Sequence, residues 1–367
     1  MTIASKQNPK NLAVTGLRKT YGDVVAVDDV SFDVAAGKLT TLLGPSGCGK
    51  TTTLRMIGGL IAPTAGSMAI AGKDITNLAP WHRNCGFVFQ SYALFPHMSI
   101  GANIGYGLNV RGWTAERIRR KVGEVADFMD IAPLLDRVPR ELSGGQQQRS
   151  AVARALAIEP DILLMDEPLA NLDAQLRERI RFEIRRLQSE LGITIVYVTH
   201  DQAEAFAISN EILVMKSGRV VQRGTPKEIF LRPASGFVAS FVGMNNLLKG
   251  QVVGVEQDAI TVQWGIFTLR GTASTVFQPD DRVVAVVGAQ NFRLASKKST
   301  ETSQINRASG QIADVSFMGT HYRIILHTDS GDLTMDLSQE QGEIADIEVG
   351  STLDIDISNV FLIPDHE

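Results

Sequence analysis

The chain has 367 residues, 44% of them hydrophobic and 21% charged, which is enough apolar material for a packed core and excludes disorder for the bulk of the chain. Its 36 basic and 40 acidic side chains give a formal net charge of −4, which argues against nucleic acid as the main partner. The two cysteines, Cys48 and Cys85, are too few for a disulfide framework and fit a reducing compartment.

Neither end of the chain nor its interior carries a membrane signal. Residues 1–14 lack the apolar run of a secretory signal, and no stretch reaches the ~20 apolar residues of a membrane-spanning helix. We therefore expect no transmembrane segment and a location inside the cell.

Up to about residue 245, apolar strand-like runs alternate with helical patterns. The clearest predicted strands are 38–43, 161–165 and 193–199, and two of them are nearly all apolar, which is typical of parallel strands covered on both faces. Between them, residues 114–137 repeat apolar side chains at helical spacing, as does the amphipathic run 177–190. The pattern predicts an α/β domain over 1–243 with a helical subdomain at about 91–157.

After the join at residues 243–246, the sequence changes to short β-type runs separated by Gly, Asp and Ser. The predicted strands are 250–255, 259–264, 282–287, 322–327 and 352–357. Residues 244–367 are therefore predicted to form a small all-β domain, a sandwich or a barrel.

The first motif with specific chemistry is 44–51, which fits the pattern GxxxxGK[ST] between a predicted strand and a predicted helix. Its glycines allow backbone N–H groups to form an anion nest, and the following helix adds its positive end. Lys50 would reach the β- and γ-phosphates of a nucleotide, and the Thr51 hydroxyl would bind Mg²⁺. The alternative is a glycine-rich turn with an incidental lysine. The predicted nucleotide contacts here are Gly44, Pro45, Ser46, Gly47, Cys48, Gly49, Lys50, Thr51 and Thr52.

Polar residues follow two predicted strands and a further apolar segment, at the edge where open α/β sheets bind ligands. Asp166 ends the strand 161–165 and suits a Mg²⁺ partner, and Glu167 beside it suits the general base that orients an attacking water. His200 and Gln90 close two other apolar segments. Taken singly, each of these four residues could equally be a polar loop or helix-capping residue.

Residues 142–149 read Leu-Ser-Gly-Gly-Gln-Gln-Gln-Arg and open a predicted helix over 147–158. Ser143, Gly144 and Gly145 offer a hydroxyl and bare backbone amides at a positive helix end, which makes a second anion site in the same chain. A head-to-tail dimer would explain both sites, because each nucleotide would lie between the lysine loop of one copy and this segment of the other.

With these motifs in this order, the chain resembles the ATP-binding subunits of ABC transporters over roughly residues 10–242. The resemblance implies an ATPase that uses ATP and Mg²⁺, with a P-loop NTPase fold. For the nucleotide, the resemblance implies that Tyr21 stacks on adenine and that Ser143, Gly144, Gly145 and Gln146 bind the nucleotide held by the partner copy. For the metal and the reaction, it implies that Asp166 and Gln90 contact Mg²⁺, that Glu167 is the catalytic carboxylate and that His200 contacts the γ-phosphate. Gln90 would also face the membrane partner, and Asp173 would belong to the D-loop.

The β-rich tail resembles the TOBE-like module, related to the OB-fold, of binding-protein-dependent bacterial importers. Segments 86–97 and 237–248 look like the polyamine and ferric-iron branches; importers of sugar, sulfate, phosphonate or glycerol phosphate are the alternatives, followed by exporter-type and soluble ABC ATPases. Residues 287–290 read Val-Gly-Ala-Gln where this module usually has Ile-Arg-Pro-Glu, which puts in doubt a regulatory contact of that Arg or Glu. The implied partners are a second copy, two transmembrane permease subunits and, indirectly, a periplasmic or lipid-anchored solute-binding protein, at the cytoplasmic face of the inner membrane.

Overall fold

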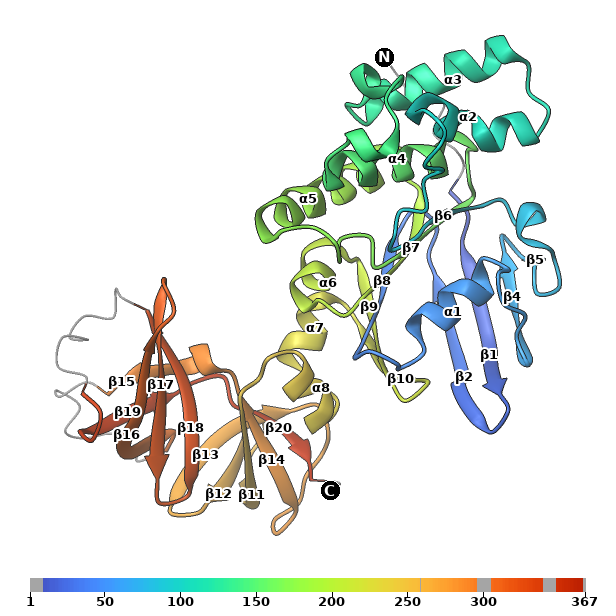
Figure 1. Ribbon diagram of the computed structural model, residues 1–367. Helices are drawn as coiled ribbons and strands as arrows, with labels where there is room; N and C mark the ends of the chain where they lie inside the picture. Colours follow the sequence, from blue (N-terminus) through green and yellow to red (C-terminus); the bar gives the residue numbers. More distant parts are fainter. Residues whose placement is uncertain (1–8, 258, 296–304, 339–347, 366–367) are drawn as a thin grey trace. The chain divides into compact units, whose positions relative to one another are not determined.

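The computed structural model describes residues 9–257, 259–295, 305–338 and 348–365. The chain divides into two compact units, Met1–Pro226 and Lys227–Glu367, and each is described by itself (Figure 1). No helix of the described residues is long and apolar enough to cross a membrane.

The first unit is built on a six-stranded sheet in the order β10-β9-β3-β8-β7-β6. Its central strands are fully buried and parallel, as expected for strands covered on both faces, and only the edge strand β10 runs antiparallel to its neighbour. The strands are β3 (Leu39–Leu43), β6 (Cys85–Val88), β7 (Ile162–Asp166), β8 (Thr194–Thr199), β9 (Glu211–Lys216) and β10 (Arg219–Gly224). The three strands predicted in this unit are confirmed.

A second, antiparallel sheet in the same unit has the order β2-β1-β4-β5. Its strands are β1 (Leu12–Tyr21), β2 (Val24–Val34), β4 (Ala65–Ile70) and β5 (Lys73–Asp74). The sequence analysis did not predict it. Its inward side chains, such as Leu12, Val27 and Met68, share one apolar core with Leu42 of β3 and Leu54 of the helix that follows β3, so this sheet packs beside the phosphate-binding loop.

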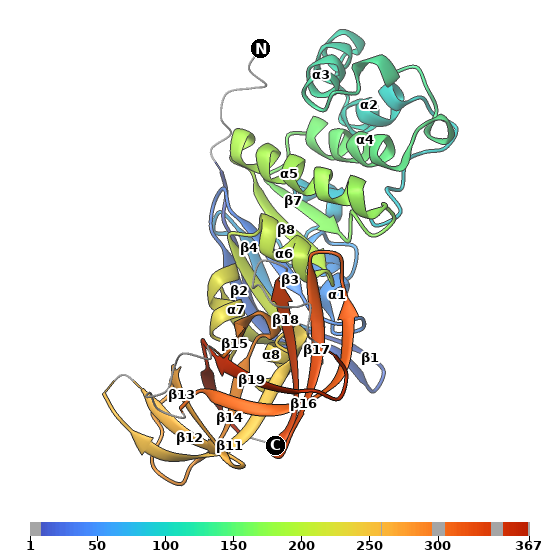
Figure 2. The same cartoon turned by 90° about the vertical axis from the view of Figure 1, so that its left-hand side faces the viewer.

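The helices of the first unit are α1 (Lys50–Ile57), α2 (Ile100–Val110), α3 (Ala115–Phe128), α4 (Gly144–Ala157), α5 (Ala174–Leu191) and α6 (Gln202–Ile208), with three short 3₁₀ turns, η1 (Pro80–His82), η2 (Ala132–Leu134) and η3 (Pro139–Glu141). Figures 1 and 2 both show α2, α3 and α4 gathered at one end of this unit, away from the β1–β2 hairpin. Among the described residues, 91–157 contain helices and no strand. The amphipathic helix predicted over 177–190 is α5, with Ile180, Ile184 and Leu187 buried.

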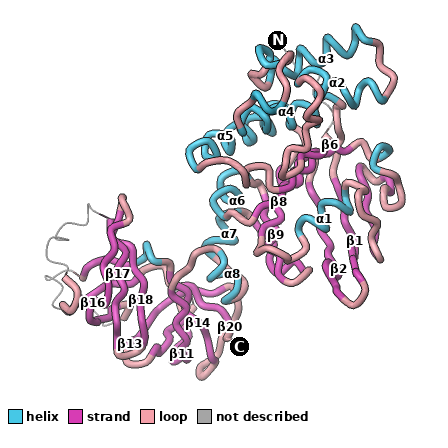
Figure 3. Tube along the Cα trace, viewed as in Figure 1, coloured by secondary structure: helices cyan, strands magenta, loops and turns pink. Residues whose placement is uncertain are grey.

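The second unit consists mainly of strands (Figure 3). Five of them close a barrel in the order β11-β12-β13-β20-β14, and five form a sheet in the order β15-β19-β16-β17-β18. They are β11 (Asn246–Val255), β12 (Ile260–Trp264), β13 (Phe267–Ala273), β14 (Arg282–Val287), β15 (Phe292–Leu294), β16 (Arg307–Phe317), β17 (His321–Thr328), β18 (Gly331–Ser338), β19 (Thr352–Ile357) and β20 (Phe361–Pro364). The all-β tail with a barrel is thus confirmed, and the second sheet is an addition to it.

Two short helices, α7 (Pro226–Leu231) and α8 (Gly236–Phe241), precede the barrel, and η4 (Ala289–Asn291) follows β14. Buried side chains of the barrel and of the five-stranded sheet, among them Val262, Phe292 and Leu326, form one core. The predicted boundary at 243/244 falls after these two helices, whereas the compact unit begins at Lys227.

Candidate functional site

The phosphate-binding loop follows the buried strand β3 and leads into α1. Gly49 is the residue before the helix and has φ 100°, a left-handed conformation that favours glycine. A Cβ atom on Gly49 would lie 2.5 Å from the carbonyl oxygen of Ala26 on β2, so no larger residue fits there without a backbone shift. The loop therefore brings its backbone against β2 and leads directly into the N-terminus of α1, where a phosphate group would bind.

Lys50 lies in the first turn of α1 and is 5% exposed. Its Nζ donates hydrogen bonds to the carbonyl oxygens of Gly44 (2.8 Å) and Pro45 (2.9 Å). The ammonium is thus held over the loop by weak neutral acceptors, which phosphate oxygens can replace with charge-assisted bonds. Cys48 is buried in the same loop, and burial raises the pKa of its thiol, so it is a small packing residue.

Thr51 and Asp166 join the loop to the end of β7. The Thr51 hydroxyl donates a hydrogen bond of 2.8 Å to Oδ1 of Asp166, which is 4% exposed. Burial is the main cause that raises the pKa of Asp166, and the Thr51 hydrogen bond and Arg55, whose Nη2 lies 3.7 Å from Oδ2, oppose it. This pair offers one hydroxyl and one carboxylate oxygen.

These oxygen donors fit Mg²⁺, which protein sites commonly hold through one or two side chains together with the phosphates of a nucleotide. Within the described residues, no group of three or more His, Cys, Asp or Glu side chains could hold a metal ion by itself. A metal at Thr51 and Asp166 would therefore depend on phosphate oxygens to complete its coordination.

The structure brings Gln90, Glu167 and His200 together. Oε1 of Glu167 lies 3.2 Å from Nδ1 of His200, and Nε2 of Gln90 donates a 3.3 Å hydrogen bond to Oε2 of the same carboxylate. Glu167 adopts φ 43°, and its backbone N–H donates to the carbonyl oxygen of Val198 on β8. This turn at the end of β7 places the carboxylate between residues that follow β6 and β8. His200 remains about half exposed, so the cluster is open to a ligand.

Ser143, Gly144, Gly145 and Gln146 form the start of α4. Ser143 is the N-cap: its Oγ accepts a hydrogen bond from the backbone N–H of Gln146, whose Oε1 accepts one from the N–H of Ser143 at 2.9 Å. Ser143 and Gly144 are exposed. In the described part of the chain, no hydrogen bond or ion pair joins this helix end to the phosphate-binding loop, so within one copy no such contact links the two candidate anion sites.

Two further predicted residues lie at the edges of the site. Tyr21 ends β1 with its ring 49% exposed, and Nζ of Lys19 lies 5.0 Å from the ring centroid. Asp173 is exposed and caps α5, where its Oδ1 accepts a 2.9 Å hydrogen bond from the N–H of Leu176. Both are available to a ligand or partner, and neither contacts the phosphate-binding loop in the described residues.

The sequence analysis missed residues that support this site. Asn171 donates a 3.0 Å hydrogen bond to the carbonyl oxygen of Gln90 and so ties the segment after Glu167 to the segment after β6. Arg177 of α5 and Glu204 of α6 line a small polar pocket together with Glu167 and His200. The signal available for Glu204 was an acidic residue among the mostly apolar side chains of α6 (Gln202–Ile208).

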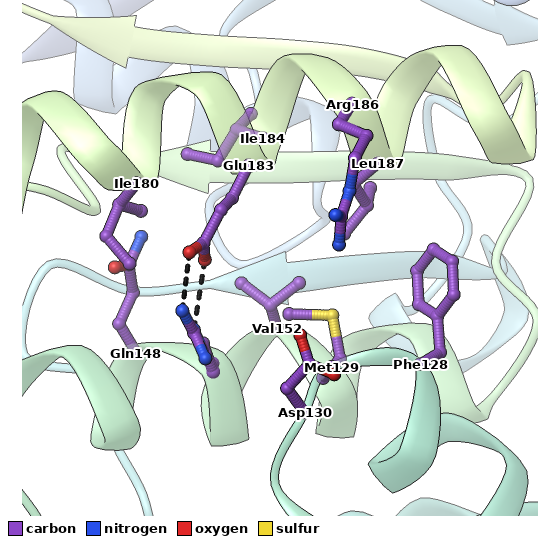
Figure 4. Close-up of a pocket in the computed structure, with 11 residues that line it drawn as sticks. Phe128, Met129, Asp130, Gln148, Val152, Ile180, Glu183, Ile184, Arg186 and Leu187 are labelled. Carbon is purple, nitrogen blue, oxygen red and sulfur yellow. Dashed lines mark hydrogen bonds and ion pairs between the residues drawn. The ribbon is translucent and has the colours of Figure 1, made fainter.

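A second pocket lies apart from this site, between α4, α5 and the end of α3 (Figure 4). Across this pocket, Arg149 of α4 forms a bidentate ion pair with Glu183 of α5. Gln148 extends from α4 toward α5, is 1% exposed and has no hydrogen-bond partner for either amide atom among the residues that the structure describes. No predicted site residue lines this pocket, so it is a feature of helix packing.

Comparisons with known proteins match this chain to two family models, that of the ABC transporter over residues 27–170 and that of the TOBE domain over residues 289–359. The Fe(3+) ions import ATP-binding protein FbpC of Pasteurella multocida is 43% identical over 330 residues, which is 90% of this chain and 92% of that protein. The protein of the same name from Rhizobium etli is 43% identical over 333 residues, 89% of this chain and 90% of its own length.

Among solved structures, a dimeric ATP-binding cassette in a post-hydrolysis state, bound to ADP and Pi, is similar with a TM-score of 0.53 and 32% identity. The match covers 59% of this chain and 98% of that chain. These similarities confirm the predicted P-loop ATPase fold and the TOBE module.

Proposed function

Because the chain belongs to the ABC transporter family, as an ATPase of the import type with a TOBE domain, we propose that it hydrolyses ATP at the site around Lys50, Asp166 and Glu167 to drive uptake of ferric iron. The ATPase domain would span residues 1–243, since all residues of the site precede Asp201 and the barrel begins with β11 at Asn246. Residues 244–367 would form the TOBE-like domain.

In this proposal, the loop Gly44–Thr52 binds the phosphates. Lys50 exchanges its two carbonyl acceptors for β- and γ-phosphate oxygens. When bound at Thr51, Asp166 and Gln90, Mg²⁺ would neutralise charge that the phosphates share. Tyr21 supplies an exposed aromatic face on which adenine can stack.

Hydrolysis then needs a water placed in line with the γ-phosphate. The Glu167 carboxylate accepts a proton from this water as its oxygen attacks phosphorus, and the bond to the β-phosphate oxygen breaks to release ADP and phosphate. Gln90 and His200 hold the carboxylate from two sides at 3.3 and 3.2 Å, so its orientation is set before ATP arrives. The exposed side of His200 is free to contact the γ-phosphate.

The separation of the two anion sites within one copy supports a head-to-tail dimer, and the similar solved structure is itself dimeric with ADP and Pi bound. In such a dimer, Ser143, Gly144, Gly145 and Gln146 of one copy face the nucleotide on the other, and Asp173 lies near the same junction. ATP binding closes the dimer and hydrolysis opens it, which is a shift between two populated states.

Ferric iron is the favoured solute because the similar proteins from P. multocida and R. etli are named Fe(3+) ions import ATP-binding proteins. Polyamines, suggested by the resemblance of segment 237–248, are the alternative solutes. The partners would be two permease subunits and a periplasmic or lipid-anchored solute-binding protein, and the chain would sit at the cytoplasmic face of the inner membrane.

The observation that carries the proposal is the meeting of Gln90, Glu167 and His200 beside the Thr51–Asp166 pair. Uptake of radiolabelled ferric iron and of putrescine should be compared in host cells that lack the gene and carry either the unaltered gene or Lys50→Ala. We expect ferric uptake to be lost with Lys50→Ala while putrescine uptake is unchanged. Loss of putrescine uptake alone would assign the polyamine branch, and loss of neither would overturn both assignments.

A further inference from the structure

Glu204 is a buried carboxylate close to His200 for which the hydrolysis scheme gives no role. It lies in the first turn of α6 and is 3% exposed. Its Oε2 accepts hydrogen bonds from the Tyr197 hydroxyl at 3.0 Å and the Thr199 hydroxyl at 2.8 Å. Burial is the main cause that raises the pKa of Glu204. The carboxylate is therefore anchored to the last residues of β8, directly before His200.

Two arginines of α5 face this carboxylate and its neighbour Asp201. Nη2 of Arg181 lies 3.2 Å from Oδ2 of Asp201, and Nη1 of Arg177 lies 3.6 Å from the same oxygen. Nε of Arg177 lies 3.9 Å from Oε1 of Glu204. Asp201 in turn caps α6, since its Oδ1 accepts a 3.0 Å hydrogen bond from the N–H of Glu204. The two carboxylates that follow His200 are thus bound electrostatically to α5.

Arg177 has a further contact that Arg181 lacks. Its Nη2 donates a 3.0 Å hydrogen bond to the carbonyl oxygen of Leu172, the residue before Asp173. One guanidinium group therefore joins segment 170–173, at the proposed junction between copies, to the two carboxylates that follow His200. The planar fork of arginine suits such a bridge, because its donors point in several fixed directions.

The bridge is incompletely closed in this structure. Among the described residues, Nε of Arg177 is buried without a hydrogen-bond partner and lies 3.9 Å from Oε1 of Glu204, and Nη1 lies 3.6 Å from Oδ2 of Asp201; both distances exceed those of hydrogen bonds. Arg177, Thr199, Asp201 and Glu204 also line the small polar pocket that Glu167 and His200 share. A small movement of segment 170–173 can thus shorten these contacts next to the catalytic carboxylate.

We propose that Arg177 is a positioning residue that transmits the placement of segment 170–173 to His200 and, through it, to Glu167. The inference rests on the proposed function, because it concerns hydrolysis at the same site. Arg177 touches neither ATP nor the attacking water in this scheme; it fixes the loop on which His200 stands. Hydrolysis would then be fastest only when the second copy holds segment 170–173 in place.

The test compares full-length Arg177→Met with Arg179→Met, which removes an exposed arginine two residues away on the same helix. For Arg177→Met we expect the kcat for ATP to fall about tenfold, with KM within about twofold of the unaltered chain. Arg179→Met should leave both values unchanged. Thermal unfolding of each variant checks that the fold is retained.

A second comparison separates positioning from a general effect on folding. In a His200→Ala background, measured by single turnover, Arg177→Met should change the rate less than about twofold, because the residue it acts through is gone. Arg177→Lys keeps the positive charge but has a single donor atom for three acceptors. Its kcat should therefore stay as low as that of Arg177→Met, while its thermal stability should match that of the unaltered chain.

An unchanged kcat in Arg177→Met, full activity in Arg177→Lys, or a tenfold loss that persists in the His200→Ala background would each overturn the positioning role. In all three cases the unaltered chain would still hydrolyse ATP, so the proposed function would stand. If the unaltered chain does not hydrolyse ATP, the proposed function and this inference both fail.

Discussion

Lys50 is a buried charge whose hydrogen-bond partners, among the described residues, all belong to its own loop. Neutral carbonyl oxygens and a thiol satisfy an ammonium group less well than phosphate oxygens do. In the proposed function, the residue would therefore make its strongest contacts only after a nucleotide has entered.

Lys50→Ala should weaken ATP binding about 10–100-fold, the usual worth of a hydrogen bond to a charged group. Calorimetric titration with ATP measures this, and Lys73→Ala, an exposed lysine on β5, is the control. Equal ATP affinity in Lys50→Ala and in the unaltered chain would rule out the phosphate-binding role of this lysine.

Asp166 shows the cost of the same site to stability. Its folded-state pKa lies above the ordinary value because burial disfavours the charged form. The ionised carboxylate therefore lowers the stability of the nucleotide-free protein at pH values above that raised pKa, and this cost disappears as the pH falls and the group binds a proton.

Asp166→Asn keeps an oxygen that can accept from Thr51 and removes the charge. We expect its free energy of unfolding at neutral pH to rise by about 1 kcal/mol while Mg²⁺-dependent ATP hydrolysis is lost. The stability gain should shrink as the pH is lowered. Urea unfolding at several pH values gives the answer, and a loss of stability at neutral pH would contradict the assigned cause of the pKa shift.

At the scale of elements, α4 places two neighbouring glutamines in opposite situations. Nε2 of Gln147 donates to the carbonyl oxygens of Pro139 (3.0 Å) and Leu142 (3.2 Å). The buried amide of Gln148 has no partner in the packing between α4 and α5. Burial of an unsatisfied amide costs free energy, whereas an apolar group of similar shape does not.

We therefore expect Gln148→Met to raise the free energy of unfolding by about 1 kcal/mol, and Gln147→Met to lower it by about the same amount. Denaturant unfolding of the two variants is a matched comparison on one helix. If the two variants lose the same free energy of unfolding, Gln148 has a hydrogen-bond partner in solution. The claim that its amide is unpaired between α4 and α5 would then be wrong.

The elements that sequence patterns predicted well are those with strong local signals. Strands β3, β7 and β8 are rich in apolar residues because both their faces are buried, and α5 repeats buried isoleucines at helical spacing. The sheet containing β1 and β4 was missed because β4 begins with exposed, small residues and β1 has register shifts that interrupt its alternation. The patterns also indicated polar residues at Gln90, Glu167 and His200. The distances between these three side chains depend on the order of the strands in the sheet, which local patterns do not give.

At the scale of the whole molecule, the barrel of the second unit depends on pairing between strands far apart in the sequence. The barrel of the second unit closes only when β20, near the end of the chain, pairs with β13 and β14. Local patterns predict its strands but carry no information on which strand closes it. This is why the sequence left sandwich and barrel open, and why the added sheet of β15 to β19 was not foreseen.

The proposed nucleotide site is complete only when two copies of the chain associate. One copy brings Gln90, Glu167 and His200 together, while Ser143 caps a different helix, α4. ATP should therefore join two copies, and a chain that cannot hydrolyse ATP should remain joined.

The measurement that tests this most directly is ATP turnover and sedimentation of full-length Glu167→Gln, with Glu178→Gln of the exposed face of α5 as the control. We expect Glu167→Gln to bind ATP as the unaltered chain does but to turn it over about 10²–10⁴-fold more slowly, because the general base is gone. In the presence of ATP this variant should sediment as two copies. Near-normal turnover in Glu167→Gln would contradict the role of Glu167 as general base, and ATP bound to single copies only would contradict the two-copy site.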